Sequence, residues 1–367
     1  MKKILCVNKY YKPVVGGVET VVRNINHVVR DSGYEVIQLC CHNHFSAFTT
    51  RENIDGVLVI RVSTLFVLFS MPVAPMFLLY YIKYRFTSDL VWLHEPFPLS
   101  TIAEGFSSYF FKRIIFCYWH SEIVRQDFIL KMLKPVYSRF LRNVDLVLVS
   151  NPKQLANSRL LKKYCANKVE VLPICVESER DVALPREDRG YFLFLGRFSY
   201  YKGLHILSEA LADERLKEIQ FKIVGNGKFD PKLISKLQNM NNVTLNTGTV
   251  TEAEKRDLIR ESIAFLFPST EVSEAFGIMQ LEAMRQGTPV INTNLRSGVP
   301  WVSVHGVSGL TIQPKNAIEL ADAILTLYRD KNLWSTLSTN AIERQKKYFS
   351  EAVFQEEVMN LVKRAFC

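Results

Sequence analysis

Residues 268–291 read Pro268-Ser-Thr-Glu-Val-Ser-Glu274-Ala-Phe-Gly277-Ile-Met-Gln-Leu-Glu282-Ala-Met-Arg-Gln-Gly287-Thr-Pro289-Val-Ile291. An apolar run at 264–267 comes immediately before them and predicts a buried strand, and residues 276–286 have the spacing of a helix. Gly-Thr-Pro then leads into a second apolar run at 289–292. A strand, a helix and a second strand in this order predict a parallel sheet with a crossover helix.

Two glutamates in this stretch, Glu274 and Glu282, are eight residues apart. If the helix begins near Phe276, Glu274 precedes its first turn, and Glu282 is rotated by about 80° beyond two turns, so both carboxylates can face one cleft. The free N–H groups at the helix start, around Phe276, Gly277 and Ile278, form an anion site between them. A nucleoside-diphosphate sugar fits this pattern, with one carboxylate for sugar hydroxyls, amides for phosphate and one carboxylate for ribose. An isolated pair would more often be a helix cap and a surface charge, but the flanking glycine and proline pattern favours the site.

The same alternation of strands and helices runs through the whole chain. The predicted strands of the first half are 3–7, 35–39, 57–62, 90–94, 114–119 and 146–149. Those of the second half are 191–195, 221–224, 243–247, 264–267, 289–292 and 309–312. The predicted helices between them include 20–31, 127–142, 203–212, 232–239, 251–261 and 276–286. We therefore predict an α/β protein with two Rossmann-like, doubly wound parallel sheets, and a ligand at the strand ends where the two domains face each other across a cleft.

The domain boundary is predicted at 177–190, a charged segment that contains Pro185 and has no periodicity. A chain of 367 residues is long enough for two cores. We expect an N-terminal domain at 1–180 and a C-terminal domain at 190–350, both Rossmann-like. A further helix is expected at 351–367.

Two further motifs follow the first predicted strand of each half. In the second half, Arg197 supplies a planar fork and Lys202 a point charge, a pair that suits a pyrophosphate and its developing leaving-group charge. In the first half, Gly16 and Gly17 let the backbone approach a ligand before a helix begins. They lack the G-x-G-x-x-G pattern of a dinucleotide site. A salt-bridged loop and a structural turn are the alternatives.

Histidines end two of the predicted strands. His120 ends the run 114–119, where a parallel sheet presents its ligands, although a lone histidine is more often structural. His94 and Glu95 end the preceding strand, and we keep them as a second cleft candidate. Glu95 has an equally good structural interpretation.

Taken together, these motifs resemble the retaining glycosyltransferase family 4, which has the GT-B fold, and the resemblance covers nearly the whole chain. The stretch from Glu274 to Glu282 is similar to the E-x7-E signature of that family. The remaining matches, in chain order, are Gly16-Gly17-Val18-Glu19 with its G-G-x-E loop, Gly196-Arg197 and Lys202-Gly203 with its G-R and K-G pairs, and Gly225-Asn226-Gly227 with its G-x-G turn near the nucleotide base.

This resemblance implies that the domain at 1–180 binds the acceptor, that the domain at 190–350 binds the nucleotide sugar, and that the helix at 351–367 crosses back to the N-terminal domain. It also implies a role for each matching residue. Glu274 would contact the donor sugar and Glu282 the ribose, and His120 would contact the donor sugar and matter for turnover. The implied catalytic residues are therefore His120 and Glu274, and the implied donor-binding residues are Gly16, Gly17, Arg197, Lys202, Gly225, Phe276, Gly277, Ile278 and Glu282. The run 119–126 looks like the branch that contains O-antigen mannosyltransferases, which favours GDP-mannose. Trp301 departs from the family pattern, which often has glutamate there.

Composition sets the compartment and the partners that we expect. The seven cysteines are scattered without a C-x-x-C pair, which argues against a disulfide framework or a zinc site and favours a reducing, cytoplasmic location. The net charge is +10, and residues 1–185 hold 23 basic and 15 acidic residues. This positive half could meet an anionic membrane or a phosphate-bearing acceptor, or could simply be a solvated surface. No nucleic-acid motif is present.

Two segments have an alternative interpretation as membrane contacts. Residues 62–82 contain no charged side chain and form a stretch long enough to span a membrane. Pro72 and Pro75, however, would break a spanning helix. We predict a loop around these prolines and an apolar helix from about 76 to 84, either as core or at a membrane surface. The basic, apolar stretch 126–142 is a membrane-surface helix or a solvated one. Peripheral association with the inner face of the cytoplasmic membrane thus stays open.

The predicted activity is hexose transfer from a nucleoside-diphosphate sugar to a lipid-linked or membrane-associated saccharide in cell-surface polysaccharide or lipopolysaccharide synthesis. No D-x-D occurs, so we expect no metal and no cofactor beyond the sugar nucleotide, with GDP-mannose favoured and a UDP-sugar as the alternative. The rivals are an inverting GT-B transferase with Glu95 or His120 as base, a nicotinamide oxidoreductase, and a catalytically silent nucleotide-sugar-binding protein.

Overall fold

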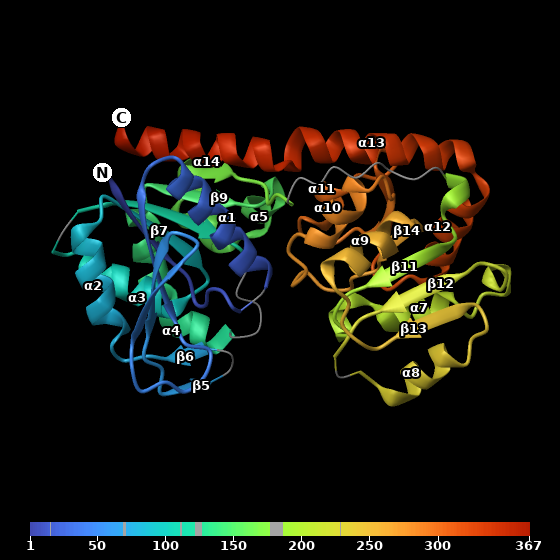
Figure 1. Cartoon of the computed structure of the whole chain (residues 1–367), viewed down its shortest axis with the longest axis horizontal. Helices are drawn as coiled ribbons and strands as arrows, with labels where there is room; N and C mark the ends of the chain where they lie inside the picture. The colour runs from blue at the N-terminus through green and yellow to red at the C-terminus, as the bar shows by residue number, and fades with distance from the viewer. Residues whose placement is uncertain (15, 69–70, 111, 122–126, 177–185, 228) are drawn as a thin grey trace. The chain divides into compact units, whose positions relative to one another are not determined.

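The structure, a computed structural model, describes residues 1–14, 16–68, 71–110, 112–121, 127–176, 186–227 and 229–367 (Figure 1). Backbone contacts divide the chain into two compact units. The first comprises Met1–Ile174 and Ala352–Cys367, and the second comprises Cys175–Glu351. Of residues 177–190, where the sequence places the domain boundary, 177–185 lie outside the described residues.

The first unit is built on an eight-stranded sheet in the order β10-β9-β8-β7-β1-β2-β4-β3, counted over the described residues. Its strands and one separate hairpin are β1 (Lys3–Val7), β2 (Glu35–Cys41), β3 (Thr50–Ile54), β4 (Val57–Val62), β5 (Phe66–Leu68), β6 (Met71–Val73), β7 (Leu90–Glu95), β8 (Ile114–Trp119), β9 (Leu146–Val149) and β10 (Val169–Val171). The sheet pairs are parallel except that β3 runs antiparallel to β4. Because β2 and β7 lie on opposite sides of β1, the chain reverses its winding there, which is where such sheets bind ligands.

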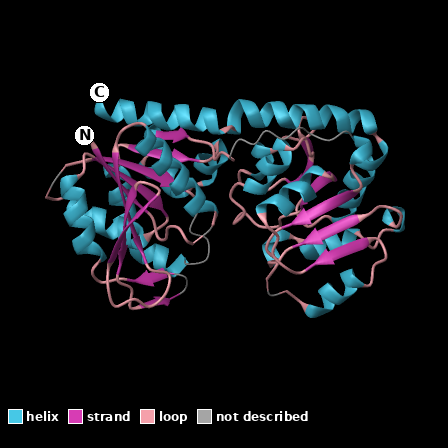
Figure 2. Ribbon diagram, in the orientation of Figure 1, coloured by secondary structure: helices cyan, strands magenta, loops and turns pink. Residues whose placement is uncertain are grey.

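The helices of the first unit flank this sheet (Figure 2). They are α1 (Gly17–Asp31), α2 (Phe77–Thr87), α3 (Pro98–Ser107), α4 (Asp127–Asn143), α5 (Pro152–Asn157), α6 (Arg159–Tyr164), a 3₁₀ turn at Ala166–Lys168 and α14 (Glu351–Phe366). Apolar side chains from the strands and from α2 and α4 form one buried core. The side chains of the α4 residues up to 133, Lys131 included, lie outside the described residues.

The last helix, α14, contacts the first unit through its C-terminal end. Arg364 forms an ion pair with Glu170 on β10, at 2.7 Å, and the ring of Phe366 stacks on Tyr34 with centroids 5.6 Å apart. These contacts hold residues 352–367 in the first unit, although more than 170 residues of the second unit separate them from it in the sequence.

Two features of the first unit differ from the sequence interpretation. The segment around Pro72 is not simply a loop, because β5 and β6 form a short antiparallel hairpin in which Val67 pairs with Pro72. A two-strand hairpin tolerates proline, since its missing N–H can face outward. The strand β3 was not predicted, because its side chains are polar and mostly exposed and carry no apolar alternation. The helix α2 is found at 77–87, close to the predicted 76–84.

The second unit contains a six-stranded sheet, all parallel, in the order β13-β12-β11-β14-β15-β16. The strands are β11 (Tyr191–Leu195), β12 (Phe221–Val224), β13 (Val243–Asn246), β14 (Ser262–Phe267), β15 (Val290–Thr293) and β16 (Gly309–Ile312). The helices are α7 (Leu204–Ala210), α8 (Pro231–Gln238), α9 (Glu252–Arg260), α10 (Ile278–Arg285), α11 (Val299–Val302), α12 (Ala317–Arg329) and α13 (Lys331–Phe349), with 3₁₀ turns at Arg186–Asp188, Tyr200–Lys202 and Glu214–Leu216. The winding reverses between β11 and β14. The prediction of two doubly wound parallel sheets is therefore confirmed.

Among the described residues, no helix has the length and apolar character needed to span a bilayer.

Candidate functional site

In the second unit, the predicted site residues follow β11 and β14, the two strands at the reversal point. Gly203 has φ +76°, and a Cβ there would collide with the carbonyl of Pro268, so only glycine lets the two loops approach this closely. The amide of Thr270 donates to the carbonyl of Tyr201 at 2.8 Å and joins the loops again. The sequence thus places the loop after β11 directly against the loop after β14.

This contact brings Lys202 and Glu274 together. The Lys202 ammonium lies 2.5 Å from Glu274 Oε2, and the two side chains are only 16% and 12% exposed. The contact is an ion pair at close range rather than an aligned hydrogen bond, because that oxygen has no hydrogen-bond partner of good geometry. The ammonium also lies over the ring of Phe267, 4.9 Å from its centroid. A largely buried cation in the loop after a strand, with one carboxylate beside it, is suited to hold an anionic ligand.

Arg197 lies in the same loop as Lys202 and is exposed; among the described residues it forms no ion pair closer than 4 Å. Gly225, which follows β12, packs against the same loop: a Cβ there would collide with the carbonyl of Gly196. The site therefore contains one cation in contact with a carboxylate and one whose guanidinium is open to solvent.

The helix α10 begins later than the sequence indicates, at Ile278 rather than near Phe276. Gly277, at φ +80°, turns the chain into it, and the ring of Phe276 is buried between Trp301 and Phe349 at centroid distances of 6.2 and 6.1 Å. Phe276 can therefore serve a ligand only through its backbone. Glu282 accordingly lies one turn into the helix instead of two.

Glu282 contacts a lysine that sequence reasoning missed. Its Oε2 lies 2.8 Å from the ammonium of Lys255 on α9, which also contacts Glu252 at 2.5 Å. Burial works to lower the pKa of Lys255, but the two carboxylates outweigh it and hold the pKa above its usual value. The lysine thus stays charged and fixes the Glu282 carboxylate. No sequence spacing signals this pair, because its members are on different helices.

In the first unit, His120 forms a buried pair with His94. The register of β7 and β8 sets His94 opposite Tyr118, and His120 Nε2 lies 2.9 Å from His94 Nδ1. The His120 backbone is held on both sides, since its N–H donates to the Glu95 carbonyl and its carbonyl accepts from Gln154. Burial lowers the pKa of His120 to about 3. Burial, together with the neighbouring His120, holds the pKa of His94 well below its usual range, so both rings are neutral.

Glu95 points away from this histidine pair into the protein. It is fully buried, accepts a hydrogen bond from the Phe97 amide at 2.5 Å and another from the Ser100 hydroxyl. Burial raises its pKa to about 7, against these hydrogen bonds. Glu95 therefore caps the start of α3 and is not a group that faces a ligand.

Gly16 and Gly17 lie at the start of α1, after the loop that follows β1. Gly16 is the residue before the helix, and Glu19 folds back over it so that a Cβ at Gly16 would collide with the carboxylate. Within the described residues, no three histidine, cysteine, aspartate or glutamate side chains are gathered as metal ligands would be. Residues 122–126, part of the stretch that favoured a mannosyltransferase, lie outside the described residues.

Replacing His120 with asparagine should change how the stability of the first unit depends on pH. The folded-state pKa of His120 is about 3 against an ordinary 6.5, so its contribution is fully present above pH 6.5 and is lost as the pH falls toward 3. The slope is about 1.4 kcal/mol per pH unit. Glu95 acts in the opposite sense, because its raised pKa adds stability at low pH that is lost as the pH rises from 4.5 through about 7.

We expect urea unfolding between pH 4.5 and 6.5 to show a slope that is smaller by about this amount in His120→Asn. The exposed His44 of the same unit gives the matched control, His44→Asn, which should keep the slope of the unmodified protein. An identical slope in all three proteins would contradict the buried, neutral state of His120.

Comparisons with known proteins agree for both units. The family profile described as "Glycosyl transferases group 1" matches residues 176–344, and that described as "Glycosyltransferase Family 4" matches residues 15–180. O-antigen chain mannosyltransferase C of Escherichia coli is 30% identical over 98% of this chain and 97% of its own. D-rhamnosyltransferase WbpZ of Pseudomonas aeruginosa is 31% identical over 72% of this chain and 70% of its own.

Solved structures show the same fold over the full length. Sucrose-phosphate synthase from Thermosynechococcus elongatus superposes with a TM-score of 0.79 at 20% identity, covering 100% of this chain and 99% of its own. Anabaena HepE in complex with UDP and glucose superposes with a TM-score of 0.74 at 19% identity, covering 99% of this chain and 100% of its own. At these identities the likeness concerns the GT-B fold alone.

Proposed function

Since the chain belongs to the group 1, family 4 glycosyltransferases, we propose that it transfers a hexose with retention of configuration from a nucleoside-diphosphate sugar, with GDP-mannose as the favoured donor. The observation that carries this proposal is the ion pair of Lys202 with Glu274 at the ends of β11 and β14. A bound diphosphate would form ion pairs with Lys202 and with the solvent-exposed Arg197. Glu274 would then be free to accept hydrogen bonds from the hydroxyls of the transferred sugar.

The second carboxylate suits the ribose. Glu282 is held by Lys255 through Oε2, which leaves its other oxygen available as an acceptor for two neighbouring hydroxyls. Arg197, Lys202 and the first amides of α10 would then stabilise the charge that grows on the diphosphate as the bond to the sugar breaks. We propose that this requires no metal, and that no group other than the sugar nucleotide takes part.

The proposed chemical step uses the donor itself as the base. The bond from the anomeric carbon to the diphosphate oxygen breaks, and the acceptor hydroxyl forms its new bond on the same face of the sugar. Its proton passes to the departing phosphate oxygen, so no side chain needs to take it. Lys202 balances the extra negative charge on the leaving group.

His120 is proposed to donate a hydrogen bond to the sugar. His94 Nε2 is buried without a partner, and a buried bare nitrogen costs less than a buried unpaired N–H, so the proton of His94 belongs on Nδ1. His94 then donates to His120 Nε2, and a neutral His120 must carry its own proton on Nδ1. This tautomer presents an N–H group, rather than a lone pair, at the end of β8.

The inverting mechanism finds less support among these residues. It needs a base on the first unit, but Glu95 is fully buried and bonded within the protein, and the lowered pKa of His120 makes it a weak base. The anomeric proton of the product, observed by NMR, separates retention from inversion. A catalytically silent binding protein would give no product at all.

The named relatives support the choice of donor and acceptor. Rhamnose is the 6-deoxy form of mannose, so the mannosyltransferase and the D-rhamnosyltransferase above are both named for a sugar with an axial 2-hydroxyl. We propose that this chain likewise transfers a sugar of the manno configuration to a lipid-linked saccharide in lipopolysaccharide or O-antigen synthesis. Its place would be cytoplasmic, at the inner face of the membrane that carries the acceptor.

Titration calorimetry with GDP, UDP and ADP and their sugars tests the proposal. We expect GDP and GDP-mannose to bind most tightly, and Glu282→Ala to weaken nucleotide binding by about tenfold or more, the value of a hydrogen bond to a charged group. Glu252→Ala is the matched control, because it removes the other partner of Lys255 and leaves Glu282 in place. Unchanged affinity in Glu282→Ala would rule out its ribose role, and the absence of binding by any sugar nucleotide would rule out the function.

A further inference from the structure

Two neighbouring helices of the first unit expose apolar stripes that the core does not use. On α2 and just before it, Met76, Leu79 and Phe86 recur at helical spacing, and on α3 and just after it so do Ile102, Phe106, Tyr109 and Phe110. All seven side chains are 43–67% exposed. We call these residues the α2–α3 face. Such a contiguous apolar surface marks an interaction site, because single exposed residues are ordinary but clustered ones are not.

The two helices are locked together on their inner sides. Glu104 of α3 accepts from Arg85 of α2 at 2.7 and 2.9 Å and from the Tyr81 hydroxyl at 2.5 Å, and all three residues are buried. The outward stripes are thus fixed side by side by a rigid connection. The α2–α3 face is a formed surface of the folded unit.

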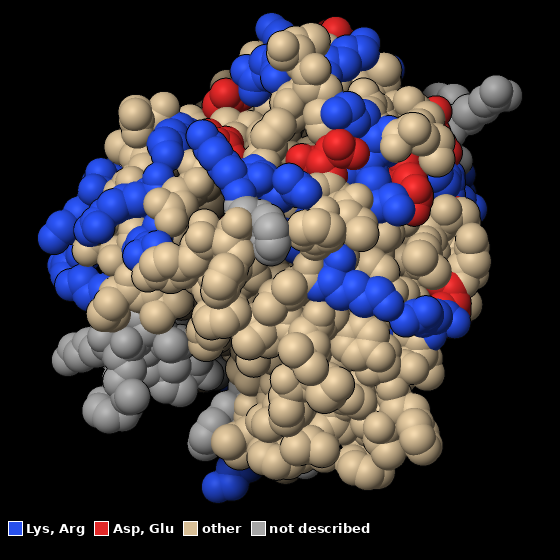
Figure 3. Space-filling model, turned by 90° about the vertical axis from the view of Figure 1, so that its left-hand side faces the viewer, with Lys and Arg blue, Asp and Glu red and all other residues tan. Residues whose placement is uncertain are grey.

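Charge on this face is of one sign. Glu104 is the only acidic residue of the two helices, and its charge is buried with Arg85. Exposed Lys83 lies within the α2 stripe, exposed Lys112 follows Phe110, and the guanidinium of Arg139 lies 3.8 Å from the ring centre of Tyr109. Figure 3, which views the molecule from this side, shows many lysine and arginine side chains, with fewer aspartate and glutamate side chains among them, beside an area almost without charge. Aromatic rings interleaved with cations are typical of proteins that lie in a membrane interface.

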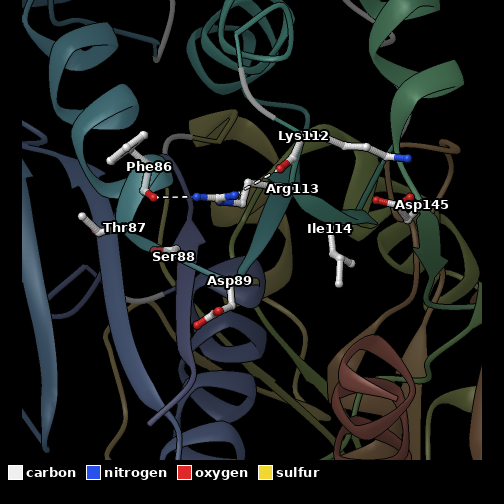
Figure 4. Close-up of a pocket in the computed structure, with 8 residues that line it drawn as sticks. All are labelled: Phe86, Thr87, Ser88, Asp89, Lys112, Arg113, Ile114 and Asp145. Carbon is white, nitrogen blue, oxygen red and sulfur yellow. Dashed lines mark hydrogen bonds between the residues drawn. The ribbon is translucent and has the colours of Figure 1, made fainter.

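A hollow at the edge of this face is lined by Phe86 and by the neighbouring Lys112. It has a volume of about 410 Å³ and lies at the starts of β7, β8 and β9, whereas His94 and His120 lie at their ends. In Figure 4 the ring of Phe86 points away from the hollow, and Arg113 donates to the Phe86 carbonyl. Asp89 and Asp145 line it but accept hydrogen bonds from the amides of Lys3 and Ile115, so they complete the strand starts. We assign the hollow itself no ligand.

We propose that the α2–α3 face docks on an anionic lipid bilayer, with its apolar side chains among the headgroups and Lys83, Lys112 and Arg139 against lipid phosphates. A second copy of the chain is a less suitable partner for this face, because the lysine and arginine side chains of one copy would lie close to those of the other and repel them. This docking specifies the membrane location proposed above but does not depend on the sugar donor, since none of these residues belongs to the donor site.

Vesicle co-sedimentation at low salt tests the docking. The full chain should bind vesicles that contain phosphatidylglycerol, should bind pure phosphatidylcholine weakly, and should be released by salt. Lys83→Gln with Lys112→Gln should weaken binding by about fivefold per lysine. Phe86→Ser with Phe106→Ser should weaken it by about tenfold per ring. Ile318→Ser with Lys232→Gln, which removes an exposed apolar side chain and a cation from the second unit, is the control and should bind normally.

Thermal unfolding and nucleotide calorimetry on each variant separate this proposal from the proposed function, because both should be unchanged. Equal binding to neutral and anionic vesicles, or equal binding by all variants, would overturn the docking even if the sugar nucleotide binds. Self-association in ultracentrifugation that is lost in Phe86→Ser with Phe106→Ser, without vesicle binding, would also overturn it and make the face an interface between copies.

Discussion

Replacing Glu104 with alanine should lower the free energy of unfolding of the first unit by about 3–5 kcal/mol, because it leaves a charge buried without its partner. Arg85 has a side chain only 2% exposed, and Glu104 supplies both of its carboxylate contacts. Burial works against the charge of Arg85, but Glu104 holds the pKa of Arg85 above its usual value. Alanine also removes the acceptor of the Tyr81 hydroxyl. Urea unfolding followed by tryptophan fluorescence measures the loss.

Two further variants separate the buried charge from the loss of packing. Arg85→Met combined with Glu104→Leu removes both charges and fills the space, and should restore most of the stability. Arg364→Ala breaks the exposed ion pair with Glu170, and should cost about 1 kcal/mol or less. A loss below about 1 kcal/mol in Glu104→Ala would show that Arg85 finds other partners.

Sequence patterns predicted the central strands well because burial alone determines them. The runs 3–7, 114–119 and 146–149 have the same bounds in the structure, and each is almost entirely buried. In a parallel sheet covered on both faces, the central strands are buried on both sides, so a short and continuous apolar run predicts such a strand. The strand β3 illustrates the opposite case. Its polar side chains are exposed, and it forms because β4 offers a free edge, which local sequence does not encode.

The start of α10 was misplaced for a tertiary reason. Residues 276–286 have helical spacing throughout, but Phe276 is drawn into the cluster with Trp301 and Phe349. Gly277 then turns the chain with a positive φ before the helix can begin. Trp301 departs from the family pattern, and the structure gives it a packing role. Its ring contacts Phe276, the residue just before the turn into α10.

The sequence supplied the candidate site residues, but it did not predict most of the contacts that they form. Motif spacing identified Lys202 and Glu274, yet their contact depends on Gly203 letting two distant loops touch. Nothing in the sequence indicated that Lys255 contacts Glu282, because this contact depends on the packing of α9 against α10. The contact of His94 with His120 could have been predicted, since two histidines at the ends of consecutive predicted strands come together if those strands are neighbours.

Replacing Lys202 with alanine should lower kcat for sugar transfer by about 10²–10³-fold, the cost of removing one preorganised group that stabilises developing charge. In the proposed reaction the negative charge on the diphosphate grows as the bond to the sugar breaks, so the ammonium acts more strongly in the transition state than on the bound donor. Its loss would also leave Glu274 without its cation and set that carboxylate against the phosphates. Steady-state kinetics with varied donor should therefore show a fall in kcat larger than the rise in KM.

Lys222 provides the matched control, because it too is a lysine of the second unit held over an aromatic ring, with its ammonium 3.9 Å from the ring centre of Tyr191. Lys222→Ala should leave kcat within about twofold, since the residue lies outside the proposed donor contacts. Lys202→Arg keeps the charge but replaces a compact ammonium with a planar fork, so partial activity is expected. If Lys202→Ala raised KM alone and left kcat intact, the lysine would bind the donor without stabilising its departure, and the leaving-group role argued from its place beside Glu274 would be wrong.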